Sequence, residues 1–173
     1  MTIPRFIEMY NMVPHEIKVL LDRCADTPQG TDWHPEGDVL THTKIVYERT
    51  RKYEDMNIAL AAIFHDLGKV TTTEENGRGG WSAHGHDQIS TDLVVKHRKW
   101  IGSIGGRFMR VKEIVENHMR IKVLDEMRSA KRRALMVHRC YPALLVFTEF
   151  HNYDIPAGRP AFRTPQNIKC TLN

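Results

Sequence analysis

Hydrophobic residues recur at helical spacing along most of the chain, and no segment alternates between apolar and polar residues for long. The clearest stripe lies within residues 107–118, whose apolar face carries Phe108, Val111, Val115 and His118. Residues 14–23 repeat the pattern in a shorter form, with an apolar face of Ile17, Leu20 and Leu21. These periods predict an all-α fold, a single helical bundle.

Capping residues and glycines indicate where the other helices begin and end. Asp38 is placed to cap a helix that runs to about residue 51, and Asp55 to cap a strongly apolar helix that stops at Gly68. Further helices are expected over residues 86–100 and over residues 129–140, with Ser129 as the cap of the second. Pro142 suits the first turn of a last long helix, whose stripe carries Phe147, Phe150 and Asp154.

Two connections, residues 30–37 and 71–85, are long for a helical bundle. Long loops inside compact domains usually carry function, so we expect functional residues in both.

Composition sets the class of protein. The chain has 173 residues, of which 41% are hydrophobic, enough for one domain with a real core. Its longest clean apolar run, residues 58–64, is far shorter than the roughly 20 residues of a membrane span. The first residues lack a secretory signal pattern, and the three cysteines form no C-x-x-C. We therefore expect a cytoplasmic protein without membrane association.

Charge is unevenly distributed. Residues 96–133 contain 12 Lys or Arg and 4 Asp or Glu, a net charge of +8, whereas the whole chain carries +4. Such a basic segment could contact a phosphate-rich partner such as RNA, or it could be the solvated face of two helices.

Histidines and aspartates occupy core-facing or terminal positions on five of the expected helices: His42, His65, Asp66, His86, His118 and Asp154. One histidine on an apolar face is usually a satisfied core residue, but six such residues on five elements argue for a shared site. His65 and Asp66 are adjacent, so both can contact one ion only over the end of their helix, where Gly68 breaks it. Imidazole and carboxylate together favour Fe, Mn, Co, Ni or Zn over a dedicated Ca site.

The order of these residues resembles the H…HD…D signature of HD-domain phosphohydrolases. The resemblance is closest to the HD domain of bacterial CCA-adding tRNA nucleotidyltransferases and related poly(A)-polymerase-like proteins. It rests on HPEGDVLTHT (34–43), AAIFHDLGKVTTT (61–73), NGRGGW…HGHDQIS (76–90), IVENHMR (114–120) and FHNYDIPAGR (150–159). We accordingly expect an N-terminal helical extension over residues 1–33, an HD domain over 34–159 and a tail over 160–173.

The resemblance implies a divalent metal (Ni, Mn, Co, Fe, Zn or Mg), bound as one or two ions. It assigns four core ligands, His42, His65, Asp66 and Asp154, and a second site completed by His86 and His118. Asp66 would bridge the ions and the attacking water, which makes it catalytic. Lys69 matches the family's lysine after HD-x-G and would bind a phosphate oxygen, although a cation near a helix end also interacts with the dipole. Weaker candidates for substrate contact are Arg78, His84 and Arg120.

The family's polymerase signature, Gly-Ser followed by D-x-D, is absent from residues 1–33, so no nucleotidyltransferase activity is expected. The activity implied is that of a phosphohydrolase for nucleotides or RNA ends, with 2′,3′-cyclic phosphates, 2′-nucleotides or phosphate monoesters as substrates. A deoxynucleotidase, a dNTP triphosphohydrolase or a cyclic-oligonucleotide hydrolase is an alternative. A non-catalytic RNA-binding module with a structural metal is another.

Overall fold

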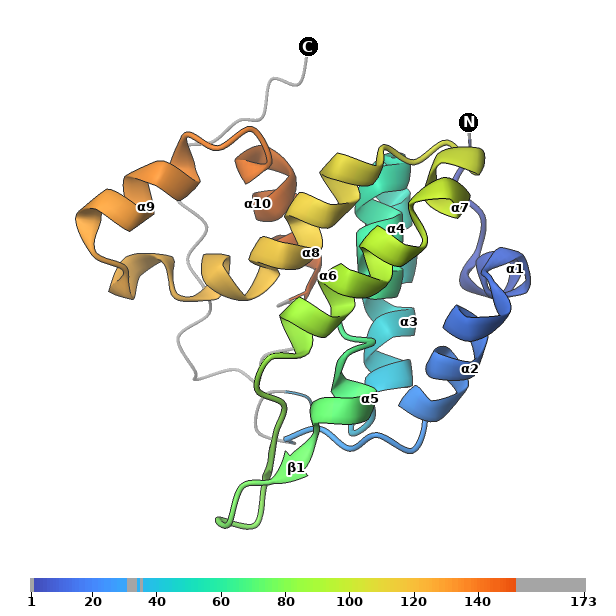
Figure 1. Ribbon diagram of the computed structural model, residues 1–173, viewed down its shortest axis with the longest axis horizontal. Coiled ribbons are helices and arrows are strands. Elements are labelled where there is room, and N and C mark those ends of the chain that lie inside the picture. Colours follow the sequence, from blue (N-terminus) through green and yellow to red (C-terminus); the bar gives the residue numbers. More distant parts are fainter. Residues whose placement is uncertain (1, 31–33, 35, 152–173) are drawn as a thin grey trace.

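A computed structural model of the chain describes residues 2–30, 34 and 36–151, with no account of the side chains of residues 150 and 151. Within these residues the fold is a helical bundle with one small hairpin (Figure 1). The α-helices are α1 (Phe6–Met12), α2 (His15–Cys24), α3 (Val39–Thr50), α4 (Met56–Phe64), α5 (Lys69–Thr72), α6 (His86–Lys96), α7 (Arg98–Ser103), α8 (Phe108–Lys122), α9 (Ser129–Met136) and α10 (Tyr141–His151). Two 3-10 helices, η1 (Arg51–Tyr53) and η2 (Leu124–Glu126), join them. The all-α expectation is confirmed.

Helix α4 forms the centre of the bundle. Eight of its nine residues are buried, all but Asn57, because the sequence MNIALAAIF has almost no polar face to expose. It packs against α3 on one side and α8 on another, and α6 and α10 in turn pack against α8. This arrangement brings α3, α6 and α8 around the C-terminal end of α4.

Helices α1 and α2 pack on the outside of α3, with α9 at the opposite end of the long axis (Figure 1). Their buried residues Phe6, Met9, Ile17 and Leu21 belong to the same core cluster as those of α4. No helix in the described part of the chain has the length and apolarity needed to cross a membrane.

Several predicted boundaries were correct. Asp38 caps α3, since its carboxylate accepts a hydrogen bond from the Thr41 backbone N–H at 2.7 Å, and Asp55 caps α4 by accepting from Asn57 N–H at 2.8 Å. Pro142 lies in the first turn of α10, as expected.

Other boundaries were wrong. The helix expected over residues 86–100 is broken at His97, whose imidazole contacts Glu16 Oε2 on α2 at 3.0 Å, and α7 follows as a separate helix. Ser129 is the first residue of α9 rather than its cap, and α9 ends at Met136 because residues 137–140 form a turn.

The long connection over residues 71–85 contains a two-stranded antiparallel hairpin, β1 (Glu74–Glu75) and β2 (Trp81–Ser82), in the register Glu74↔Ser82. It projects from the end of the bundle at which α5 lies (Figure 1). The pairing is too short to leave a period-two signal in the sequence.

Candidate metal centre

The Asp66 carboxylate is the centre of a cluster of histidines from four parts of the fold. Its Oδ2 lies 3.2 Å from His65 Nε2 and 3.7 Å from His42 Nε2. Its Oδ1 lies 3.3 Å from His86 Nε2 and 3.8 Å from His118 Nε2. All five side chains are buried. The structure therefore brings together five of the six predicted ligands, while Asp154 lies outside the described residues.

The turn after α4 explains how two adjacent residues reach one centre. After Phe64 the backbone bonds tighten to three-residue spacing, with Leu67 N–H donating to Phe64 O at 3.2 Å and Lys69 N–H to Asp66 O at 3.0 Å. The Asp66 side chain thereby turns toward the side of the helix end that His65 occupies. Both side chains therefore lie at the end of the helix, where one ion could contact both.

Gly68 allows α6 to approach this turn closely. A Cβ at this position would lie 2.2 Å from the backbone oxygen of His86, and Gly68 N–H donates to Ser90 Oγ on α6 at 2.9 Å. His86 is the first residue of α6, after Gly85 in the left-handed region (φ 78°). The absence of a side chain at Gly68 thus brings His86 to Asp66.

Three of the histidines are oriented by backbone carbonyls three residues earlier in the chain. Their Nδ1 atoms bond Ala62 O (His65, 2.9 Å), Ala83 O (His86, 2.7 Å) and Val115 O (His118, 2.6 Å). A carbonyl oxygen only accepts, so each Nδ1 carries the proton and donates it. In the neutral rings, the Nε2 lone pairs therefore face Asp66.

The protonation states fit a bound cation. Burial lowers the pKa of His65 and lowers that of His118 well below its usual value, which keeps both imidazoles neutral. Burial acts to raise the pKa of Asp66, but the neighbouring His65 and the ammonium group of Lys69, 2.8 Å from Oδ2, hold it well below its usual value. The centre thus presents lone pairs and an ionised carboxylate.

The close approach of these acceptors indicates a metal site. His86 Nε2 and His118 Nε2 are 3.3 Å apart, and a neutral pair in these tautomers has no proton to place between the two atoms. Four groups in the described part of the chain could each hold an ion, and two of them share Asp66: His42–His65–Asp66 and Asp66–His86–His118. Nitrogen and carboxylate donors fit a divalent transition metal.

Lys69 lies at the edge of this cluster. Its Nζ is 2.8 Å from Asp66 Oδ2 and 2.7 Å from Gln29 Oε1, and its side chain is 12% exposed. Gln29 was not predicted from the sequence, because a glutamine in a loop carries no motif. The structure thus places an ammonium group beside the carboxylate, at a point that is partly open to solvent.

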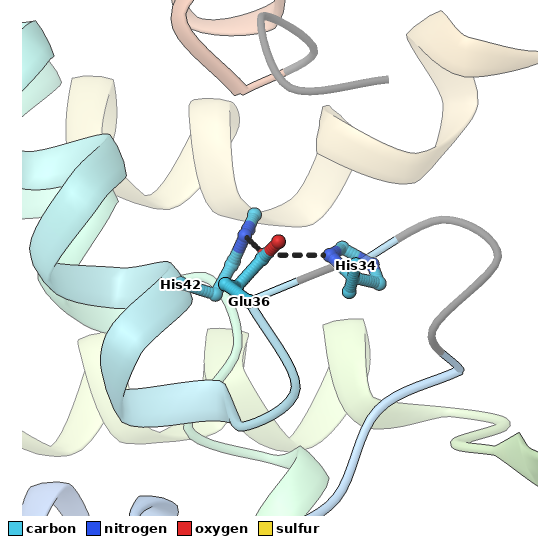
Figure 2. Close-up of side chains that lie close together, drawn as sticks. All are labelled: His34, Glu36 and His42. Carbon is cyan, nitrogen blue, oxygen red and sulfur yellow. Dashed lines mark hydrogen bonds and ion pairs between the residues drawn. The ribbon is translucent and has the colours of Figure 1, made fainter. Parts of the chain in front are cut away.

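Glu36, a charged residue near the centre, was also not predicted from the sequence. Glu36 accepts hydrogen bonds at Oε1 from His42 Nδ1 (2.5 Å) and His34 Nδ1 (3.1 Å), as Figure 2 shows. Burial acts to raise the pKa of Glu36, yet these two bonds hold it well below its usual value. Its place in the connection over residues 30–37 was the available signal, since that loop was expected to be functional.

Lys122 lies one helical turn beyond His118 on α8, and so on the same face. Burial lowers its pKa to about 8, the charge of Lys69 acts in the same direction and that of Asp66 opposes it. The i, i+4 spacing from His118 was the signal that could have identified it.

The three weaker candidates for substrate contact lie elsewhere among the described residues. Arg78 and His84 are exposed and line a surface pocket on the hairpin with Glu74, Glu75 and Asn76. Arg120 is exposed on α8 and donates to Asn117 Oδ1 at 2.7 Å. None of the three belongs to the clusters around Asp66.

The sequence model described as "HD domain" matches residues 39–140. This range contains all five residues gathered at the centre, and it covers more than half of the chain. The protein therefore belongs to the HD-domain superfamily of metal-dependent phosphohydrolases.

Curated relatives show which HD-domain proteins this chain is similar to. The chain is 41% identical over 75 residues to the Multifunctional CCA protein of Thioalkalivibrio sulfidiphilus (strain HL-EbGR7), and 36% identical over 78 residues to that of Shewanella frigidimarina (strain NCIMB 400). These matches cover 43% and 44% of this chain but only 18% of each relative. No solved structure matches the chain significantly. The resemblance to the HD region of CCA-adding enzymes is confirmed.

Proposed function

We propose that this protein is a metal-dependent phosphohydrolase that acts on nucleotides or RNA ends, as a 2′,3′-cyclic phosphodiesterase or phosphatase. One observation carries the proposal: the buried Asp66 carboxylate lies within 4 Å of the Nε2 atoms of four histidines and of Lys69 Nζ. A carboxylate shared by two groups of metal-ligating side chains is suited to a hydrolytic centre.

The proposed ligands of one ion are His42, His65 and Asp66, with Asp154 added by resemblance alone. Those of a second ion are Asp66, His86 and His118. When bound, a divalent metal lowers the pKa of a coordinated water and offsets the charge that develops on the phosphoryl oxygens. The ionised Asp66 carboxylate can accept a hydrogen bond from the attacking water and orient it toward phosphorus.

Lys69 is proposed to bind a non-bridging phosphoryl oxygen. Its ammonium group is already held beside Asp66 by Gln29, so little side-chain freedom is lost when a substrate arrives. Arg78, His84 and Arg120 stay predictions as substrate contacts, with weaker support because they lie outside the cluster.

Nucleotides and RNA ends are the proposed substrate class because the relatives are named for CCA, the sequence at the tRNA 3′ end. Since the matches cover 18% of those relatives, their activities are not carried over as a whole. The division into an extension, a domain over residues 34–159 and a tail is likewise part of the proposal. So is a reducing, cytoplasmic location, which the buried free thiols of Cys24 and Cys140 suit.

The test is hydrolysis by the full chain, stripped of metal and reloaded with Mn²⁺, Co²⁺ or Ni²⁺. The substrates are 2′,3′-cyclic nucleotides, 2′-nucleotides, bis-p-nitrophenyl phosphate and dNTPs. We expect metal-dependent release of the monoester or phosphate, and a loss of at least ~10³-fold in kcat/KM for Asp66→Ala, since the lost metal is worth several kcal/mol. Asp26→Ala, which removes an exposed carboxylate, is the matched control.

Other outcomes identify the alternatives. Release of triphosphate from dNTPs, with no cleavage of cyclic phosphates, would point to a triphosphohydrolase. RNA binding that survives chelation, with no hydrolysis of any substrate, would point to a binding module. Full activity in Asp66→Ala would show that the reaction takes place elsewhere.

A further inference from the structure

Glu36 lies between two histidines in the loop before α3 (Figure 2). Its side chain is only 8% exposed, and its Oε1 accepts from His42 Nδ1 at 2.5 Å and from His34 Nδ1 at 3.1 Å. The two rings also meet edge to face, with centroids 4.6 Å apart. A buried carboxylate that joins a metal-ligating histidine to a second histidine calls for an explanation beyond packing.

These three side chains could in principle hold an ion of their own, because their donor atoms lie close together. The distances favour hydrogen bonding instead. Two donors that share an ion at ~2.0–2.2 Å in a tetrahedral or octahedral arrangement are about 3 Å or more apart. The 2.5 Å separation of His42 Nδ1 and Glu36 Oε1 is shorter than that, and it fits a hydrogen bond to a charged acceptor.

The bond to Glu36 also distinguishes His42 from its neighbours at the centre. His65, His86 and His118 donate their Nδ1 protons to backbone carbonyls, whereas His42 donates its proton to a carboxylate. A carboxylate at Nδ1 fixes the ring and makes Nε2 a more basic ligand. His42 Nε2 is also the atom that faces Asp66 Oδ2.

We propose that Glu36 is a positioning residue of the metal centre: it holds His42 through Nδ1, and His34 in turn holds Glu36. Glu36 and His34 thereby set how tightly the ion at His42, His65 and Asp66 is bound. This inference rests on the metal centre of the proposed function, and it adds two residues that do not themselves contact the ion.

The test is Mn²⁺ titration of the metal-free full chain by calorimetry. We expect Glu36→Gln to bind the ion at His42 about 10–100-fold more weakly than the wild type, because an amide oxygen can still accept from Nδ1 but carries no charge. Glu36→Asp keeps the charge, so its Mn²⁺ affinity should lie between those of the wild type and Glu36→Gln. His34→Asn should weaken binding in the same direction, while Glu75→Gln, on the exposed hairpin, is the matched control.

Two further readouts separate positioning from a loss of folding. The free energy of unfolding of each metal-free variant should stay close to that of the wild type. In Co²⁺-loaded protein, the visible absorption bands should shift in Glu36→Gln, because the ligand field of His42 changes, and should not shift in Glu75→Gln.

Unchanged Mn²⁺ affinity in Glu36→Gln, with normal binding by the wild type, would overturn this inference alone. If His34→Asn and Glu36→Gln each bound one ion fewer than the wild type, the two residues would be metal ligands. That result would overturn the inference too. A wild-type chain that binds no ion would overturn the proposed function as well.

Discussion

Gly68 determines how closely α6 approaches the turn that carries His65 and Asp66. The position that a Cβ would occupy is 2.2 Å from His86 O and 2.9 Å from His86 Cα, both atoms of backbone that cannot rotate away. The close approach places His86 Nε2 3.3 Å from Asp66 Oδ1. A single missing side chain therefore links the packing of two elements to the geometry of the centre.

Gly68→Ala is expected to displace the start of α6. Because the clash is with backbone, the free energy of unfolding should fall by about 3 kcal/mol, at the upper end of the usual cost of overpacking. Binding of the ion at His86 and His118 should weaken with it. Urea denaturation and Mn²⁺ titration measure the two effects.

Gly102→Ala is the matched control, because a Cβ there would meet nothing within 4 Å on the exposed side of α7. Alanine is the better helix former, so this variant should be unchanged or more stable by about 0.5–1 kcal/mol. Equal destabilisation by both substitutions would contradict the close-approach argument.

At the scale of elements, the two capped helices deliver their ligands from opposite ends. His42 lies in the first turns of α3, and its backbone N–H donates to Asp38 O at 3.2 Å. His65 follows the last residue of α4, ten residues from the cap at Asp55, which is roughly 15 Å along the helix. Fraying at the N-terminus therefore affects the centre through α3 but not through α4.

This difference predicts distinct results for two cap substitutions. Asp38→Ala and Asp55→Ala should each lower the free energy of unfolding by about 1 kcal/mol, the usual value of an N-cap. Only Asp38→Ala should also weaken Mn²⁺ binding, by several-fold, because His42 becomes less well positioned. The same loss of affinity in Asp55→Ala would argue against a local effect of the cap.

The sequence could predict most of the elements but not their interruptions. The caps at Asp38 and Asp55 are side-chain effects that act within three residues, so they are visible locally. The break at His97 is not visible locally: it lies at a residue whose imidazole contacts Glu16, 81 residues away in the sequence. The hairpin was hidden because each strand has only two residues.

The site residues that could be predicted from the sequence are those with a local signal. His118 could be predicted because it continues an apolar stripe, and His65 and Asp66 because they end an apolar helix. Glu36 lies in a connection expected to be functional, but no motif marks its contact with His42. Gln29 could not be predicted, because its partner Lys69 is 40 residues away in the sequence.

On the scale of the whole molecule, the basic segment over residues 96–133 is partly neutralised by acids from other elements. Glu16 on α2 pairs with Lys96 at 2.6 Å, and Asp55 pairs with Arg110 at 3.5 Å. A denser basic group remains at α9: Arg128, Lys131, Arg132 and Arg133, all exposed except the half-buried Arg132. We propose that this α9 cluster is the part of the segment that contacts RNA phosphates.

Salt dependence tests that contact. For an RNA oligonucleotide with a 2′,3′-cyclic phosphate end, kcat/KM should fall more steeply with salt than for the mononucleotide, by about 0.7 in log–log slope for each phosphate contact. Arg133→Glu should flatten the slope for the oligonucleotide, whereas Lys52→Glu on η1 should not. Equal slopes for both substrates in the wild type would show that the protein makes no further contact with RNA phosphates, and an unchanged slope in Arg133→Glu would place that contact outside this cluster.

The most direct measurement of the central claim is anomalous diffraction from crystals of the full chain loaded with Mn²⁺. We predict an anomalous peak within coordination distance of the Asp66 carboxylate and of the Nε2 atoms of His42 and His65, and a second peak beside His86 and His118 if two ions bind. Fully loaded crystals with no anomalous peak at Asp66 would contradict the account.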